Sequence, residues 1–186
     1  MSNAATELLI LTIDDESMIR QSIAGFLEDF GYRVIEAENG IQGLEMVKAE
    51  NPDLILLDLS MPKMDGFEVL ERLTEDKCEK PIIVISGIGI IRDAIKALRL
   101  GAWDYLVKPI EDLDLLAHSV DKCLERARLI RENAQYQENL ELEVQKRTKE
   151  LDETNQRLKE TLSDLQISEK KFRTLADTSP MAIVIF

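Results

Sequence analysis

The sequence has few of the residues that build secreted, membrane-spanning or cysteine-ligated proteins. Its two cysteines, Cys78 and Cys123, match no zinc-site spacing and favour a reducing compartment. No hydrophobic run reaches the roughly 20 residues of a membrane span, and no segment reads as a signal peptide. Lysine and arginine number 23 against 36 acidic residues, so the basic surface that nucleic-acid binding needs is missing. We therefore expect a cytoplasmic protein that contacts neither membranes nor nucleic acids.

Glycine and proline are also missing from much of the second half of the chain. No glycine follows Gly101, and no proline occurs between Pro109 and Pro180. Because these residues are the usual helix terminators, their absence predicts one uninterrupted helix from about 112 to 175. Such a helix would be roughly 95 Å long at 1.5 Å per residue. It cannot bury its apolar residues against one small domain, so it needs a partner helix.

Charge divides the chain at about the same place. The first 123 residues carry 24 acidic and 12 basic side chains, whereas residues 124–175 carry 11 of each. We expect four segments with different characters. These are a disordered N-terminus or tag remnant at 1–6, a globular domain at 7–125, a helix at 126–175, and the truncated start of another domain at 176–186.

Short apolar runs alternate with helix-period stretches throughout the globular segment. This alternation is typical of βα units, in which helices cover both faces of a parallel sheet. The runs are rich in β-branched residues and are bounded by turn residues, which favours strands over buried helices. We predict strands at 8–13, 33–36, 53–57, 82–86 and 104–107.

Polar residues follow four of these predicted strands. Asp14 and Asp15 come after the first strand, Asp58 after the third, Ser86 at the end of the fourth, and Lys108 after the fifth. In an open α/β sheet, ligands bind in the crevice at the carboxyl ends of the strands. Three carboxylates gathered there would repel one another unless a hard divalent cation joined them. The pattern therefore predicts a cation site with one lysine and one hydroxyl beside it.

Together with the sequence DLSMPKMDG at 58–66, these residues resemble the receiver domain of two-component response regulators. The resemblance covers about residues 7 to 125. It implies a flavodoxin-like, doubly wound, five-stranded parallel sheet of order 2-1-3-4-5. It also implies that Asp58 accepts a phosphoryl group from a sensor histidine kinase or a phosphotransfer protein in a Mg²⁺-dependent reaction. Such a domain is not a conventional enzyme, since it catalyses only its own phosphorylation and dephosphorylation.

The resemblance also assigns the residues that hold the cation. Asp15 and Asp58 would bind Mg²⁺ directly, and Asp14 would bind it largely through water. The backbone carbonyl of Ser60 would supply another oxygen. Mg²⁺ suits this set because it prefers octahedral oxygen ligands and keeps several waters.

Further roles are implied for the residues after the fourth and fifth strands. Lys108 would neutralise charge on the phosphoryl group, and Ser86 would donate a hydrogen bond to one of its oxygens. Ser86 and Tyr105 would form the switch that responds to phosphorylation. The peptide bond between Lys108 and Pro109 is expected to be cis.

Apolar residues recur every seven positions along the predicted helix, at Val144, Leu151, Leu158, Leu165 and Phe172. A heptad repeat is typical of coiled coils, but two companion stripes are possible. One contains Arg147, Thr154, Thr161 and Ser168; the other contains Thr148, Asn155, Leu162 and Glu169. We favour the second, because a buried Asn at an a position favours a two-stranded parallel pair. We therefore expect a homodimer held through this helix.

Two further segments have family resemblances. Residues 144–151 are similar to the signalling helices that join domains in sensory proteins. Residues 168–175, followed by Ser179-Pro180-Met181-Ala182, resemble the entry into a PAS sensor domain. The implied role of the helix is to relay the receiver's switch to a downstream PAS or output domain.

Three other functions fit the sequence less well. A Mg²⁺-dependent aspartyl-nucleophile phosphatase of the haloacid dehalogenase kind needs a second Asp as general acid, but Asp58 is followed by Leu59-Ser60. A flavodoxin-like binder needs a hydroxyl- and glycine-rich phosphate loop where this chain has Asp14-Asp15. A structural coiled-coil protein with an inactive receiver would not need all the polar residues at the strand ends.

Overall fold

The computed structural model of the chain describes residues 8–87, 91–110 and 113–178, with side chains as far as residue 175. Strands and helices alternate strictly along these residues. In chain order they are β1 (Leu9–Ile13), α1 (Ser17–Asp29), β2 (Arg33–Ala37), α2 (Gly40–Glu50), β3 (Leu54–Leu57), α3 (Gly66–Glu75), β4 (Ile82–Ser86), α4 (Ile91–Arg99), β5 (Asp104–Val107) and α5 (Leu113–Thr178). The five predicted strands agree with the observed ones to within one residue at each end.

All five strands join one parallel sheet in the order β2-β1-β3-β4-β5. β1 lies between β2 and β3, with Ile10 opposite both Val34 and Leu54. Parallel pairing requires a crossover between successive strands, and α1 to α4 supply these crossovers. The predicted doubly wound, flavodoxin-like fold is confirmed, and so is the long C-terminal helix.

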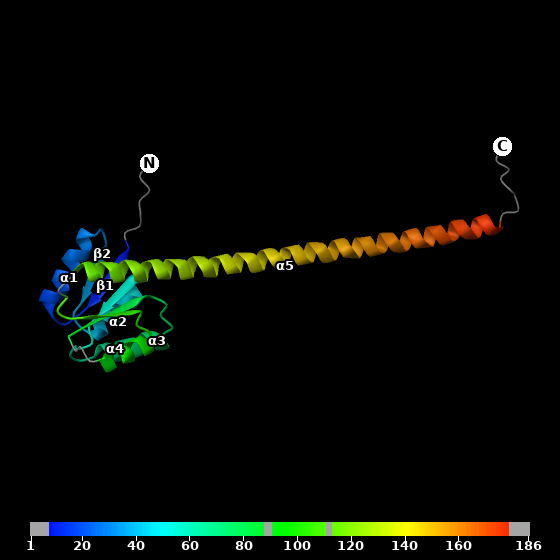
Figure 1. Cartoon of the computed structure of the whole chain (residues 1–186). Helices are drawn as coiled ribbons and strands as arrows, with labels where there is room; N and C mark the ends of the chain where they lie inside the picture. The colour runs from blue at the N-terminus through cyan, green and yellow to red at the C-terminus, as the bar shows by residue number, and fades with distance from the viewer. Residues whose placement is uncertain (1–7, 88–90, 111–112, 179–186) are drawn as a thin grey trace. The chain divides into compact units, whose positions relative to one another are not determined.

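Alternate residues of the central strands enter two separate cores. Helices lie on both faces of the sheet (Figure 1). Ile55 and Leu57 of β3 point into the core covered by α2, α3 and α4. Leu54 and Leu56 point into the core covered by α1 and the beginning of α5. All four side chains are fully buried, because a central parallel strand has no solvent-facing side. The sheet is therefore a rigid platform for the residues at its carboxyl edge.

The chain divides into two compact units, Met1–Arg131 and Glu132–Phe186. In the first unit, α5 packs on the sheet through Leu116, Val120 and Leu124. In the second unit, the described apolar side chains of α5 are exposed. None of the described helices combines the length and apolar character that a membrane crossing requires. The predicted N-terminal tag remnant and residues 179–186 of the predicted PAS start lie outside the described residues.

Candidate functional site

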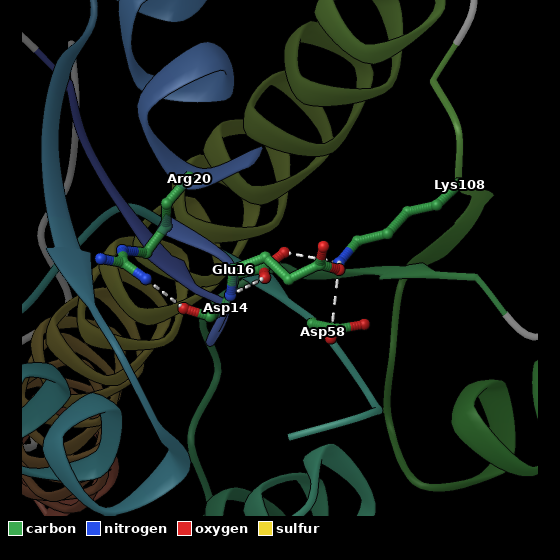
Figure 2. Close-up of polar contacts among 5 residues, drawn as sticks. All are labelled: Asp14, Glu16, Arg20, Asp58 and Lys108. Atoms are coloured by element: carbon green, nitrogen blue, oxygen red, sulfur yellow. Dashed lines mark hydrogen bonds and ion pairs between the residues drawn. The ribbon is translucent and has the colours of Figure 1, made fainter. Parts of the chain in front are cut away.

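The carboxyl ends of β1, β3 and β5 bring two acidic residues and one lysine together (Figure 2). Asp14 follows β1 and is 2% exposed, and Asp58 follows β3 and is 3% exposed. The Lys108 ammonium, just after β5, lies 2.7 Å from Asp14 Oδ2 and 3.4 Å from Asp58 Oδ2. Three of the predicted site residues, distant in sequence, thus form one contact cluster.

The charge of Lys108 is fixed by this environment. Burial alone lowers the pKa of its ammonium, because a charged group loses hydration. The hydrogen bond to Asp14 and the charges of Asp58 and Asp14 outweigh burial, so the net effect raises the pKa of Lys108. Lys108 is therefore a permanent cation beside the two buried carboxylates.

Asp58 is the less satisfied of the two buried acids. Burial raises the pKa of its carboxyl group, and the charge of Asp14 adds to the increase. Lys108 and a backbone hydrogen bond from Ser60 lower the pKa of Asp58 but do not cancel the increase. Asp58 Oδ1 is buried and has no hydrogen-bond partner among the described residues. A buried carboxylate oxygen without a hydrogen-bond partner lowers the stability of the fold unless a ligand or cation binds to it.

The acidic pocket fits a divalent cation. Oxygens of Asp14, Asp15 and Asp58 all lie within 4.8 Å of one another, and Asp15 is the exposed member of the set. Hard carboxylate oxygens with an open, solvent-facing side match the preference of Mg²⁺ for oxygen ligands and retained waters. The unpartnered Asp58 Oδ1 supports the same conclusion, so the pocket is typical of Mg²⁺ binding.

The other predicted site residues differ in how deeply they are buried. Ser86 is fully buried at the end of β4, and its carbonyl accepts a hydrogen bond from the Lys108 backbone N–H. Tyr105 lies on β5 and is partly buried against the core on the α4 side. Ser60 is exposed in the loop after β3. The bond between Lys108 and Pro109 is cis, as expected.

The start of α3 presses directly on the backbone of Asp58. A Cβ added to Gly66 would lie 2.3 Å from the Asp58 carbonyl oxygen and 2.8 Å from Leu59 Cα. Asp65 caps α3 reciprocally with Glu68, which fixes where the helix begins. Gly66 is thus required by this close approach, a role that the motif alone did not reveal.

Two more residues of the site were missed by the sequence analysis. Glu16 donates its backbone N–H to Asp14 Oδ1 at 2.9 Å, and its carboxylate lies 3.7 Å from the Lys108 ammonium. Arg20 donates to the backbone carbonyl of Asp14 at 2.6 Å. Glu16 could have been noticed because it adjoins the acidic pair. Arg20 lies on α1, and its reach toward the loop is visible only in three dimensions.

The sequence that forms this site matches a known family model. Residues 10–120 match the model of the response regulator receiver domain. Among curated relatives, the chain is 43% identical over 108 residues to "Probable transcriptional regulator ycf27" of Porphyridium aerugineum, covering 58% of this chain and 45% of that protein. It is 36% identical over 115 residues to "Regulator of RpoS" of Escherichia coli strain K12, covering 62% and 34% respectively. The chain thus spans less than half the length of these two proteins.

Solved structures resemble the same part of the chain. A response regulator receiver domain protein from Clostridium thermocellum gives a TM-score of 0.62 at 31% identity, covering 66% of this chain and 98% of that one. The receiver domain of NtrX from Brucella abortus gives a TM-score of 0.59 at 34% identity, covering 62% and 98%. Both comparisons match almost all of the other chain and leave about a third of this one unmatched.

Proposed function

The chain belongs to the response regulator receiver domain family, and we propose that it accepts a phosphoryl group on Asp58. Response regulators receive phosphate from histidine kinases, so the donor is a sensor histidine kinase or a phosphotransfer protein. The observation that carries the proposal is the unpartnered, buried Oδ1 of Asp58 beside the Lys108 ammonium. One oxygen of the carboxylate lies near the Lys108 ammonium, and the other has no hydrogen-bond partner among the described residues.

In the proposed reaction, the Asp58 carboxylate attacks the phosphorus of a phosphohistidine. The phosphorus–nitrogen bond breaks, its electron pair stays on the donor's imidazole, and an acyl phosphate forms on Asp58. Lys108 offsets the negative charge of the phosphoryl oxygens, which Asp14 and Asp58 would otherwise repel. Asp15 and Asp58 would hold Mg²⁺, with Asp14 acting through water and the Ser60 carbonyl adding another oxygen, and the ion would supply further positive charge for this step.

Ser86 and Tyr105 are the proposed switch. Ser86 shares the edge of the sheet with Lys108, since their backbones are hydrogen-bonded at 2.9 Å. Its hydroxyl turns to donate to a phosphoryl oxygen once Asp58 is modified. Tyr105, partly buried on the neighbouring strand, then moves inward behind it.

The test is covalent labelling with a small donor. The protein is incubated with acetyl phosphate and Mg²⁺, and its intact mass is measured with and without EDTA. We expect one added phosphoryl group, lost with EDTA and lost in Asp58→Asn. Asp29→Asn, an exposed acid at the end of α1, is the matched control and should be labelled normally. Labelling that persists in Asp58→Asn would refute the assignment, and rapid Asp58-dependent hydrolysis of phosphomonoesters would instead support the phosphatase alternative.

We also propose that α5 pairs two chains as a parallel coiled coil. The heptad residues Val144, Leu151, Leu158, Leu165 and Phe172 are 56% to 77% exposed, so each leaves apolar surface in water. The threonines near the stripe suit an interface, because the hydroxyls of Thr148, Thr154 and Thr161 already donate to carbonyls of their own helix. Burying these side chains leaves no unsatisfied hydroxyl donor.

Light scattering on stripe variants tests the dimer. Leu158→Lys places a charge in the proposed interface and should shift the protein toward monomer. Gln156→Lys adds the same charge off the stripe and should leave the dimer intact. Spin labels at Gln145 and Gln166, one per chain, should give short distances at both positions if the pair is parallel. Equal masses for the two lysine variants would overturn the coiled coil.

The role proposed for this helix is to pass the state of Asp58 to a PAS or output domain that follows. The support is continuity, since α5 begins on the receiver core and contains the whole heptad stripe. Phosphorylation would favour one of the two companion stripes over the other. Adding beryllofluoride, a phosphoryl mimic, should change the spin-label distances; unchanged distances with Asp58 occupied would rule out this relay.

A further inference from the structure

A partly buried arginine, Arg20, joins the acidic loop of the site to the neighbouring edge strand. The Arg20 side chain is 13% exposed although it starts from the first turn of α1. Its Nη1 donates to the backbone carbonyl of Asp14 at 2.6 Å (Figure 2). Its Nε donates to Glu36 Oε2 at 3.0 Å. One planar guanidinium therefore connects the loop after β1 with β2.

Every polar group of Asp14 is held by a different part of the fold. Its N–H donates to the Ala37 carbonyl at 3.1 Å, and its Oδ1 accepts from the Glu16 N–H at 2.9 Å. Its Oδ2 accepts from Lys108 at 2.7 Å. The carbonyl is held by Arg20. Of these four contacts, the one from Arg20 is the one that fixes the peptide plane leading into Asp15.

We propose that Arg20 is a positioning residue for the divalent-cation site. By holding the Asp14 carbonyl, it fixes the plane of the peptide between Asp14 and Asp15, and with it the direction in which the exposed Asp15 carboxylate leaves the backbone. Asp15 has no burial to hold it in place, so its direction depends on this peptide. The inference rests on the proposed function, in which Asp15 is a direct ligand of the cation.

Arg20 contributes to the proposed cation site through geometry rather than through its charge. Glu36 pairs with the guanidinium at 3.0 Å and offsets its positive charge. A cation beside three carboxylates would by itself compete with a bound metal, so charge alone predicts tighter metal binding when Arg20 is removed. Positioning predicts weaker binding. Arginine also offers a rigid fork that a lysine lacks, so Arg20→Lys keeps the charge and loses the simultaneous contacts.

Calorimetric titration of the full chain with Mg²⁺ separates these alternatives. We expect the Kd of Arg20→Lys and Arg20→Met to rise about tenfold, the lower end of what loss of an outer-shell partner produces. Lys48→Met removes a positive charge from an exposed ion pair with Asp76 and is the matched control for net charge. An unchanged or lower Kd in both Arg20 variants would overturn the proposal.

A double variant that also changes Asp15 distinguishes a positioning role of Arg20 from a purely structural one. If Arg20 acts through Asp15, Arg20→Met should add nothing to the loss caused by Asp15→Ala, so the two effects are non-additive. Multiplicative losses in the double variant would overturn the proposal. Wild-type protein that fails to bind Mg²⁺ would instead refute the proposed function itself, which keeps the two failures distinct.

A second pair of variants leaves Arg20 in place, so a change in Mg²⁺ affinity cannot come from misfolding caused by the loss of Arg20. Glu36→Ala removes the other anchor of the guanidinium and should raise the Kd for Mg²⁺ about threefold relative to Glu38→Ala, a smaller loss than that of a direct outer-shell partner. Both changes remove one negative charge from an exposed or half-exposed position near the end of β2, so their electrostatic effects on the cation are similar. Equal affinities in these two variants would count against Arg20 as the residue that positions the loop.

Discussion

The two units of the chain differ in how far they bury their leucine side chains. Leu56 on β3 is 0% exposed, enclosed by α1, α5 and neighbouring strands, whereas Leu158 on α5 is 56% exposed. The receiver unit buries most of its strand leucines within one chain, and three of its acidic residues, Asp14, Asp15 and Asp58, lie together at the candidate cation site. The helical unit, Glu132–Phe186, has 11 acidic and 8 basic residues, and its described leucines are exposed. The first unit therefore has a hydrophobic core of its own, whereas the described apolar side chains of the second unit are exposed to solvent.

The same comparison extends to polar groups. In the receiver, buried polar atoms are held by contacts between distant elements, such as the Ser119 hydroxyl donating to Asp104 at 2.7 Å. Along the rest of α5, ion pairs connect residues one turn apart, such as Arg147 with Glu143. Local pairs of this kind stabilise any helix slightly and specify no partner. In the coiled coil proposed above, the choice of partner would therefore depend on the apolar stripe.

Truncating one leucine in each unit is the strongest test of this contrast. Leu56→Ala should lower the free energy of unfolding by about 2–5 kcal/mol, because it removes a fully buried side chain and leaves a cavity. Leu158→Ala should change the unfolding of the receiver by less than about 0.5 kcal/mol, since it contacts none of that core. Urea denaturation followed through Trp103 fluorescence measures both. Similar losses would mean that the two units fold as one.

Gly66→Ala tests the close approach behind Asp58. Its new Cβ would lie 2.3 Å from the Asp58 backbone oxygen, so either α3 or the segment after β3 must shift. We expect a loss of about 1–3 kcal/mol in unfolding free energy, the usual cost of overpacking, together with weaker labelling by acetyl phosphate. Gly25→Ala is the matched control, because its Cβ meets no atom within 4 Å and alanine favours the helix. Normal labelling of Gly66→Ala would show that Asp58 tolerates the displacement.

These variants also mark how far the sequence alone could predict the site. Asp14, Asp58 and Lys108 were predictable because parallel strands carry residues that follow them to one edge of the sheet. Gly66 and Arg20 were not, since a close approach or a long side chain's reach depends on how elements pack. The strands were predictable for a related reason: runs buried on both faces are apolar throughout. The register of the coiled coil stays a prediction, because two companion stripes of similar polarity compete.

Asp58→Asn should stabilise the receiver when no cation is present. Burial raises the pKa of Asp58, so its ionised form costs stability at neutral pH. The stabilising contribution of the raised pKa is complete below the ordinary carboxyl value and is lost as pH rises through the folded value. With EDTA near pH 7, we expect Asn to gain on the order of 1 kcal/mol, the scale of one unsatisfied buried group.

The gain of Asp58→Asn should shrink as pH falls through the raised pKa of Asp58 toward the ordinary carboxyl value. Adding Mg²⁺ should stabilise the wild type more than the variant, reducing or reversing the difference. Urea unfolding at several pH values, with EDTA or Mg²⁺, gives both results. A wild type more stable than Asp58→Asn in EDTA at neutral pH would contradict the view that this carboxylate is under-satisfied.

The smallest expected effect concerns a hydrogen bond that links α5 to the turn between α1 and β2. The Tyr32 hydroxyl donates a hydrogen bond to Asp121 of α5. Burial raises the pKa of Tyr32, and the hydrogen bond and the charge of Asp121 raise it further. Tyr32→Phe should cost about 0.5 kcal/mol, because the pair is largely exposed. Tyr136→Phe, on the exposed part of α5 and without a described hydrogen bond, should cost nothing measurable.

This hydrogen bond can be tested by the pH dependence of the stability difference between the wild type and Tyr32→Phe. A raised tyrosine pKa gives stability that is complete below the ordinary value of about 10 and is lost as pH rises through the folded value. The difference between wild type and Tyr32→Phe should therefore be constant near neutral pH and shrink above about pH 10. Urea unfolding from pH 7 to pH 11 measures it, with Tyr136→Phe as the reference. A difference that grows with pH would mean that Asp121 does not accept the tyrosine proton in solution, and that α5 is held on the receiver by its apolar contacts alone.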